Sequence, residues 1–436
     1  MKIDDFCSYV RYCANNAGML DASAMPTSEG GKCILPPYPE YGNYTIRGVD
    51  GRPGQSYPSA YLTVTCNPGF VVDEKNFSIC SNGDWSDPIP KCVRFCRLSK
   101  HVSVEYRCSI PGSDEGSREC GPFERNGTIA TPVCRRPNYY SQGLLSPMNC
   151  VDGSWDSVAT CKPECGTISP EALQLMVGGW SAKRGELPWH AGIYDKTMTP
   201  YMQICGGSLI STSIIISAAH CFWSDKYKLL PKTNYAVAVG KRYRPWDEDH
   251  DIDAQQSDVN IKIPSSFYGS ATNFQDDIAI VIVATPFELK PFIRPVCIDF
   301  DEDFDAQQLN YHNLGKVAGW GLTANGKPSQ VLKVVELPFV NNTECTKEVP
   351  EDFLADITSD KICAGYSNGT TLCQGDSGGG LAFPSTERGM KRYYLRGIVS
   401  TSPKPKAGEH CNTDSVIAFT RVVYHHKFIE KYYNQK

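Results

Sequence analysis

The chain has 436 residues, of which 41% are apolar and 21% charged, and its formal net charge is −5. This length exceeds what one ordinary core supports, so it predicts two or three domains. The weakly acidic balance gives no electrostatic reason to expect nucleic acid or an anionic membrane as a partner. No apolar run approaches the ~18–20 residues that a membrane span needs, so we expect no membrane span.

Twenty cysteines, an even number, indicate a disulfide framework in a secreted, extracellular protein. The repeated CxxC or HxxxH pairs of zinc sites do not occur, so we expect no metal and no other cofactor. Residues 1–5 carry acids where the apolar core of a signal peptide should begin, so we expect a chain that is truncated upstream or whose start is misassigned. Five sequons fit a secretory route as candidate glycosylation sites: Asn43, Asn76, Asn126, Asn341 and Asn368.

Cysteine spacing divides the chain into two regions. Twelve cysteines lie between Cys7 and Cys161, among turn signals and short β-type runs, which is typical of small modules that depend on crosslinks. Only seven follow Cys165, among longer alternating apolar runs such as 208–219. We therefore predict a mostly β protein, in which small modules precede a larger β-domain and residues 162–175 form the linker.

Residues 33–92 hold four cysteines and close with the letters GDWSDPIPKC. This frame resembles a sushi (complement control) module over its whole length. An unrelated small disulfide domain is the alternative, which the ending disfavours. The resemblance implies that Trp85 packs on two bridges, Cys33–Cys80 and Cys66–Cys92.

Residues 96–161 hold six cysteines and repeat the sushi-type ending around Trp155, which predicts an atypical six-cysteine sushi-like module. Six cysteines permit fifteen pairings. Residues 1–32, with Cys7 and Cys13, give no interpretable pattern and are an unassigned N-terminal remnant. For the six cysteines of residues 96–161 we prefer, by analogy with the sushi frame, the disulfides Cys96–Cys150 and Cys134–Cys161, with Cys108–Cys120 as an additional disulfide.

Three short motifs in the second region carry groups suited to acyl transfer. The letters SAAHC place His220 beside a cysteine whose crosslink would fix the imidazole as a general base. The letters DDIAI place Asp277 at the start of a run apolar enough to bury it, and a buried carboxylate needs a hydrogen-bonding partner. The letters CQGDSGG place Ser377 on a tight glycine loop.

Alone, each motif has a plain structural interpretation: an exposed histidine, an acid at a strand start, or a glycine turn. Together they fit nucleophilic catalysis, in which Ser377 attacks a carbonyl, His220 takes and returns its proton, and Asp277 holds the imidazole tautomer. The backbone amides of Gly375 and Ser377 are the candidate oxyanion hole.

These motifs resemble those of the chymotrypsin-like (trypsin family) serine proteases, and the resemblance extends over 176–436. Further matches are the segments PW, CGGSL, AGWG and FTRV. The resemblance implies a double β-barrel and endopeptidase activity. It also implies four bridges, the last of which ties the linker to the protease domain: Cys205–Cys221, Cys345–Cys363, Cys373–Cys411 and Cys165–Cys297.

The letters MVGG at 176–179 match the activation site of this family. Cleavage after Leu175 would expose a new amino terminus at Met176, which the resemblance pairs with Asp376. Burying one ion without the other is strongly unfavourable, so we expect the uncut chain to be a nearly inactive zymogen. Because the cut follows a leucine, we hypothesise self-activation once a partner clusters the zymogen.

Three positions of the implied specificity pocket depart from the trypsin pattern. Thr371 occupies the base, where trypsin-like members carry an aspartate, while Ile417 and Ser402 replace wall glycines. A Thr–Ile pocket cannot neutralise a buried guanidinium, so lysine and arginine should be rejected. We expect leucine or a similar medium apolar residue at the scissile position.

The order of modules and protease resembles the modular serine proteases of insect haemolymph. The resemblance implies an enzyme that starts an extracellular innate-immune cascade of the Toll or prophenoloxidase type. Its partners would be a downstream protease zymogen as the protein substrate and an upstream pattern-recognition protein. The alternative is a catalytically inactive homologue that acts as a cascade cofactor or scaffold, which the presence of all three catalytic residue types disfavours. Simple digestion is disfavoured by the attached modules.

Overall fold

The computed structural model describes residues 31–436 except 73–74, 113–115, 142, 169–184, 324, 367–370, 388 and 434–436. The chain forms two compact units. The first comprises residues 1–133 and 144–159, and the second comprises residues 134–143 and 160–436. Cys7, Cys13, Leu175, Met176 and Asn368 lie outside the described residues.

The first module of unit one is a five-stranded antiparallel sheet with the strand order β3-β2-β5-β7-β8. Its central strand β5 alternates exposed and buried residues, so Ala60, Leu62 and Val64 point into a small core closed by the Cys33–Cys80 disulfide. A second disulfide joins Cys66 to Cys92. The strands of this module are β1 (Cys33–Ile34), β2 (Gly42–Ile46), β3 (Val49–Asp50), β4 (Ser56–Tyr57), β5 (Ser59–Cys66), β6 (Phe70–Val72), β7 (Phe77–Ser81) and β8 (Asp84–Trp85).

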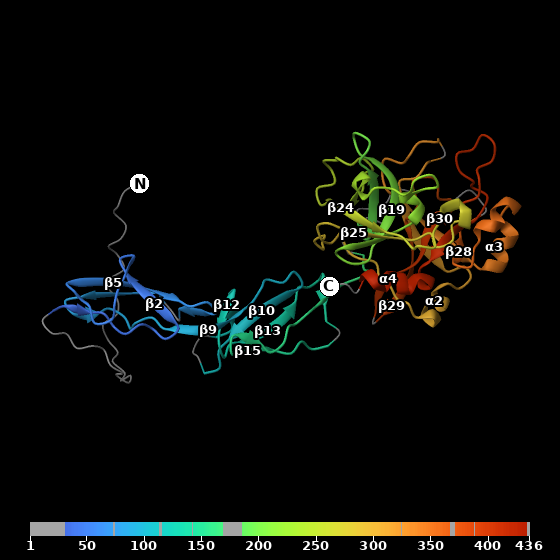
Figure 1. The fold of residues 1–436 in the computed structure, drawn as a ribbon. Helices are drawn as coiled ribbons and strands as arrows, with labels where there is room; N and C mark the ends of the chain where they lie inside the picture. The colour runs from blue at the N-terminus through green and yellow to red at the C-terminus, as the bar shows by residue number, and fades with distance from the viewer. Residues whose placement is uncertain are drawn as a thin grey trace. The chain divides into compact units, whose positions relative to one another are not determined.

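One strand joins the first module to the next (Figure 1). The first half of β9 (Cys92–Arg97) pairs with β6, and its second half pairs with β12 (Phe123–Arg125). The second module adds the sheet β11-β10-β13-β15-β16. These strands are β10 (Val104–Ser109), β11 (Arg118–Glu119), β13 (Ile129–Cys134), β15 (Met148–Val151) and β16 (Ser154–Trp155).

The six-cysteine segment divides between the two units. Its disulfides join Cys96 to Cys150, Cys108 to Cys120 and Cys134 to Cys161. Residues 134–143 belong to unit two, because β14 (Tyr139–Tyr140) pairs with β17 (Lys162–Pro163) and the Asn138 side chain donates a hydrogen bond to the Leu289 carbonyl. The segment therefore ends on the surface of the protease region.

Unit two contains two closed six-stranded barrels, and these confirm the predicted mostly β, double-barrel fold. In barrel order, the first is β18 (His190–Asp195), β19 (Met202–Leu209), β20 (Ile214–Ser217), β25 (Ala279–Val283), β24 (Gln255–Lys262) and β23 (Tyr235–Val239). The second is β26 (Leu314–Gly319), β27 (Lys333–Val340), β28 (Lys361–Ala364), β31 (Ile417–Arg421), β30 (Met390–Thr401) and β29 (Gly380–Glu387).

One buried apolar cluster spans the two barrels, and the second barrel has a further cluster of its own. All five residues of β23 are buried, and its Tyr235, Val237 and Val239 side chains belong to the apolar cluster that fills the first barrel. Trp320 and Ile398 of the second barrel belong to the same buried cluster as Ile193 and Val237 of the first. A functional group at the junction of the barrels therefore sits on a packed and rigid support.

Short helical segments connect the strands. Asp301 and Asn341 cap two α-helices of the described residues, because each side chain accepts a hydrogen bond from a backbone N–H in the first turn. The α-helices are α2 (Glu302–Gln308), α3 (Asn342–Glu348) and α4 (His426–Tyr433), and the 3₁₀ turns are η1 (Ala219–Phe222), η2 (Lys232–Asn234), η3 (Gly269–Thr272), η4 (Glu351–Asp356) and η5 (Val422–His425). A two-stranded ribbon, β21 (Trp223–Ser224) with β22 (Lys228–Leu229), follows η1.

The disulfides of the second module should stabilise it according to the length of chain that each encloses. The Cys108–Cys120 bridge spans 12 residues and the Cys96–Cys150 bridge spans 54. Replacing both cysteines by alanine should lower the free energy of unfolding of unit one by about 3 kcal/mol for the short bridge and about 4 kcal/mol for the long one. Calorimetry of the full chain measures both, with the transition of unit two as the internal reference. Equal losses, or the reverse order, would contradict this expectation.

Candidate active site

His220 lies on a short turn that directly follows a buried strand. Every residue of β20 is buried, and the chain then enters η1, which carries the histidine. The Cys205–Cys221 disulfide ties this turn to β19. The imidazole is therefore held on a rigid wall, while 22% of its side-chain surface remains open to solvent.

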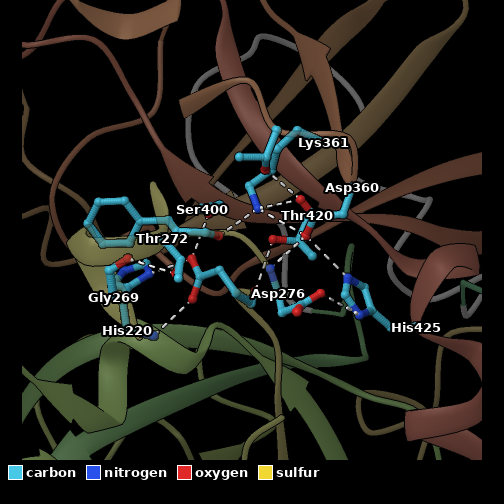
Figure 2. Close-up of polar contacts among 12 residues, drawn as sticks. His220, Gly269, Thr272, Asp276, Asp360, Lys361, Ser400, Thr420 and His425 are labelled. Atoms are coloured by element: carbon cyan, nitrogen blue, oxygen red, sulfur yellow. Dashed lines mark hydrogen bonds and ion pairs between the residues drawn. The ribbon is translucent and has the colours of Figure 1, made fainter. Parts of the chain in front are cut away.

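Asp277 is fully buried and meets the imidazole directly. Its Oδ2 lies 2.8 Å from His220 Nδ1, and its Oδ1 accepts a 2.9 Å hydrogen bond from the His220 backbone N–H. The Ser400 hydroxyl donates to Oδ2 at 2.6 Å, and the Thr420 hydroxyl donates to the Asp277 backbone carbonyl at 2.9 Å (Figure 2). These four contacts fix both the carboxylate and the ring that it faces.

The electrostatics of this pair favour an ionised aspartate beside an imidazole. Burial lowers the pKa of His220, but the charge and hydrogen bond of Asp277 outweigh it and leave that pKa above 6.5. Burial raises the pKa of Asp277, yet the charge of His220 and the hydrogen bonds from His220 and Ser400 hold it below 3.8. With Nδ1–H donated to the carboxylate, Nε2 is the nitrogen that can accept a proton.

The Ser377 loop packs onto the same wall as His220. Gly378 has φ +78°, and a Cβ there would overlap Ser217 Oγ and come within 2.5 Å of the Gly206 carbonyl oxygen, so only glycine fits. The Gly206 N–H donates to the Ser377 carbonyl at 2.7 Å. No hydrogen bond joins the Ser377 hydroxyl to His220 in the described part of the chain.

Two backbone N–H groups of this loop are available as donors. Those of Gly375 and Ser377 donate to no other described residue, whereas the Gly378 N–H donates to the Val399 carbonyl. Gln203 holds the Gly375 peptide from the first barrel, because its side-chain amide donates to the Gly375 carbonyl at 2.9 Å. A carbonyl oxygen bound at this loop would therefore meet donors that no protein acceptor occupies.

The Asp376 carboxylate lies against the end of β26, where it would overlap a Cβ on Gly319 or Gly321. Its carboxylate accepts hydrogen bonds from the N–H groups of Gly321, at 2.8 Å, and Cys373, at 2.9 Å. No cation pairs with it among the described residues, and burial raises its pKa to about 6. A cavity of about 460 Å³ adjoins this carboxylate and is lined in part by Thr371, Leu372 and Gly321.

The three expected pocket positions differ in their surroundings. Thr371 is half-buried, and its hydroxyl donates to the Leu372 carbonyl at 3.2 Å. Ile417 is 1% exposed, lies opposite Ala364 in the neighbouring strand, and belongs with Leu372 to the buried apolar cluster of the second barrel. Ser402 is exposed just after β30. Of these three residues, Thr371 lines the cavity beside Asp376, whereas Ile417 and Ser402 do not.

Metal-type donor atoms gather at three places among the described residues. Two of these groups contain the sulfurs of a disulfide, which are not free thiolates. The third comprises Asp276, Asp360 and His425, and there the Lys361 ammonium already pairs with Asp360 at 3.2 Å. The donor sets of the described residues thus favour no metal.

The sequons differ in accessibility. Asn43, Asn76 and Asn126 are exposed in unit one. Asn341 is half-buried and caps α3 with its side-chain oxygen, which leaves its amide nitrogen outside that hydrogen bond.

Comparison with known proteins gives matches over both units. The model of the Trypsin family matches residues 176–429, and that of the Sushi repeat (SCR repeat) matches residues 33–92. The modular serine protease of Drosophila melanogaster is 28% identical over 362 residues, which cover 80% of this chain and 56% of that protein. Clotting factor C of Tachypleus tridentatus is 28% identical over 428 residues, which cover 85% and 41%. The beta subunit of clotting factor G from the same species is 32% identical over 235 residues, which cover 52% and 71%.

The chain spans about half the length of the first two of these relatives. None of the helices in the described residues is long and apolar enough to cross a membrane. The trypsin match covers more than half of the chain and coincides with the two barrels and their His220–Asp277 pair. The chain therefore belongs to the trypsin family of serine proteases, and it carries a sushi repeat ahead of its protease domain.

Proposed function

We propose that the chain is a secreted serine endopeptidase zymogen, activated by cleavage after Leu175, that starts an extracellular proteolytic cascade. One observation carries the enzymatic part: His220, paired with the buried Asp277, lies on the wall against which the Ser377 loop packs. Acyl transfer needs a nucleophile, a fixed base and oxyanion donors at such a place.

In the proposed reaction, the Ser377 oxygen attacks the scissile carbonyl and His220 Nε2 takes its proton. The N–H groups of Gly375 and Ser377 stabilise the oxyanion that forms. His220 returns the proton to the leaving amine, and a water molecule then repeats the cycle to release the acid and free Ser377. Asp277 remains ionised and stabilises the imidazolium in both halves.

Activation would act through Asp376. A buried carboxylate without a cation is costly, and an ammonium at Met176 would supply the missing charge. The cavity beside Asp376 offers room for that new terminus. The pair would then hold the backbone of Gly375 and Ser377 in the geometry that the oxyanion requires.

The proposed specificity is for a medium apolar residue, above all leucine. Thr371 offers a hydroxyl and no charge, so a lysine or arginine side chain would find no counter-ion. Ile417 is buried, and its side chain in place of a glycine would shorten the proposed pocket for large aromatic side chains. Leu175 itself satisfies this preference, which supports activation of one zymogen molecule by another.

The extracellular cascade role is supported by similarity and by the disulfides. The nine disulfides among the described residues, which include the Cys165–Cys297 link between the linker and the protease domain, suit an oxidising compartment. The relatives include a modular serine protease and a clotting factor. We infer a downstream protease zymogen as the protein substrate, an upstream pattern-recognition protein that clusters this chain, and a role in innate immunity.

The direct test combines active-site labelling with sequencing of the cut site. The processed wild-type chain should react with a labelled fluorophosphonate and give a new N-terminal sequence beginning Met-Val-Gly-Gly. The Ser377→Ala variant should not be labelled and should be cut only when active wild-type enzyme is added. Processing of pure Ser377→Ala protein without another protease would exclude self-activation, and failure of the cut wild type to be labelled would exclude the enzyme.

The unpaired Asp376 should make the uncut chain lose stability as the pH rises. Its folded pKa of about 6 lies above the ordinary 3.8, so its contribution is fully present below about pH 4 and is lost as the pH passes about 6. The difference corresponds to about 3 kcal/mol in the free energy of unfolding. In a Ser377→Ala background, urea unfolding between about pH 4 and pH 7 should show this slope, and Asp376→Asn should reduce it.

The same substitution has a second expected effect on the cut enzyme. A neutral asparagine side chain at position 376 cannot pair with the new ammonium, so correctly cut Asp376→Asn enzyme should have little activity. Turnover of a peptide substrate by the purified cut variant measures this loss. Near-normal turnover by that enzyme would refute the switch.

The pocket assignment predicts a graded response to substitution. Wild-type enzyme should prefer leucine to arginine at the scissile position in a peptide library. Ile417→Ala should raise kcat/KM for phenylalanine substrates relative to leucine substrates by about tenfold, because it opens the pocket. Thr371→Asp alone should raise kcat/KM for arginine substrates only slightly, since Ile417 would still fill the pocket. A wild-type preference for arginine, or an unchanged profile in folded Ile417→Ala enzyme, would contradict this assignment.

A further inference from the structure

The loop that precedes Asp277 has an unusual backbone. Three non-glycine residues in it have positive φ: 49° at Asn273, 55° at Phe274 and 61° at Asp276. Each such residue costs on the order of 1 kcal/mol or more, and the conformation persists only where the surroundings hold it. Hydrogen bonds within the loop, such as that from the Phe274 N–H to the Gly269 carbonyl at 3.0 Å, hold part of this shape, and contacts from outside the loop add to them.

Two adjacent residues at the start of β28, a strand of the second barrel, supply support from outside the loop (Figure 2). The Lys361 ammonium donates a 2.8 Å hydrogen bond to the Phe274 carbonyl, and the Asp360 carboxylate accepts a 2.9 Å hydrogen bond from the Asp276 N–H. The loop is thus held on both sides of Gln275 by residues 84 and 87 positions further along the chain.

Asp360 and Lys361 form a buried ion pair. The Lys361 side chain has no exposed surface, and its Nζ lies 3.2 Å from Asp360 Oδ2. The Thr358 hydroxyl donates to the other carboxylate oxygen at 2.6 Å. A desolvated pair keeps its geometry because either charge left alone would be strongly destabilising.

His425 on η5 links this pair to the loop a third time. Its Nε2 lies 3.3 Å from Asp360 Oδ2, and its Nδ1 lies 3.9 Å from Asp276 Oδ1, as the labelled side chains in Figure 2 show. Three donor atoms of Asp276, Asp360 and His425 lie close enough together to suggest a cation site. The Lys361 ammonium already supplies the positive charge at Asp360, so a fixed lysine accounts for the cluster without a metal.

We propose that Asp360 and Lys361 are positioning residues for catalysis. They clamp residues 274–276 from the second barrel and so hold Asp277 against His220, and the Lys361 ammonium places one fixed positive charge behind the His220–Asp277 pair. The loop residue Phe274 also touches His220, because the two rings meet edge to face at 6.2 Å between centroids. The clamp thus reaches the imidazole through both Asp277 and Phe274. It rests on the catalytic roles proposed above.

The charges around the clamp give the proposal a signature that stability alone cannot produce. Burial lowers the pKa of His220, Asp277 raises it, and the charge of Lys361 lowers it. Other charged groups surround Lys361. His425 contacts its partner Asp360 and also Asp276. Burial raises the pKa of Asp356 on η4, and the charge of Lys361 lowers it. The net effect of Lys361 on His220 therefore opposes protonation of the imidazole.

Two charge-removing variants should move the His220 pKa in opposite directions. Lys361→Met removes the repelling charge, so the pKa should rise and the acid limb of kcat/KM should move to higher pH. Asp360→Asn leaves the ammonium uncompensated, so the pKa should fall and the limb should move to lower pH. In both, kcat should fall about 10-fold to 100-fold through misplacement of Asp277, with KM changed by less than about twofold. Lys361→Arg should keep the wild-type limb.

A matched control exists in the same unit. Lys241 and Asp251 form another buried ion pair, with side chains 1% and 3% exposed and 3.0 Å between charged atoms, on a loop that makes none of these contacts. Lys241→Met should lower the melting temperature without moving the His220 pKa. Shifts in the same direction for both clamp variants, or shifts no larger than in the control, would overturn the proposal.

A titration that needs no turnover separates this proposal from the proposed function. Carbon-13 labelled histidine in the uncut Ser377→Ala chain gives the His220 pKa by NMR, with the resonance assigned by its loss in His220→Ala. Opposite shifts of the His220 pKa in the Lys361→Met and Asp360→Asn variants would support the clamp. An inactive cut wild-type enzyme would contradict only the proposed function. A change in the wild-type melting temperature or titration on adding EDTA would show a bound metal and would also overturn the clamp.

Discussion

Asp277 is a carboxylate withdrawn completely from water, and much of the protease region is arranged to make that burial tolerable. Its oxygens take hydrogen bonds from the ring and backbone of His220 and from Ser400. Ser400 and Thr420 come from the second barrel, while His220 comes from the first. The carboxylate therefore depends on both barrels being folded and docked, and the apolar cluster that contains residues of both barrels provides that docking.

Much of the site could be predicted because its residues lie in short contiguous motifs. His220, Asp277 and Ser377 each sit in a string whose local chemistry suggests a role, and cysteine spacing predicted the module frame. Ser400 could not be predicted in this way, because it lies 123 positions from Asp277 in the sequence and the residues next to it form no motif that indicates this contact. Asp360 has the same difficulty.

The division of the six-cysteine segment was also beyond the sequence. A disulfide frame predicts which residues are joined and is silent about which neighbour each half packs against. Residues 134–143 pair with β17 and reach the Leu289 carbonyl, and so belong with the barrels. Such contacts depend on the complementary shape of two surfaces and on single hydrogen bonds, and neither produces a periodic pattern in the amino-acid sequence. The apolar runs predicted only a larger β-domain, and its division into two barrels was implied by the resemblance of the motifs to those of the trypsin family.

The shared strand β9 has a consequence for how this kind of chain can vary. Side chains in a strand alternate between faces, so a one-residue insertion between Cys92 and Cys96 would invert one half of β9 relative to the other. Cys92 or Cys96 would then point away from its sulfur partner. Most junctions between modules are loops that tolerate insertions and deletions. In this strand, only an insertion or deletion of an even number of residues would keep Cys92 and Cys96 on the same face.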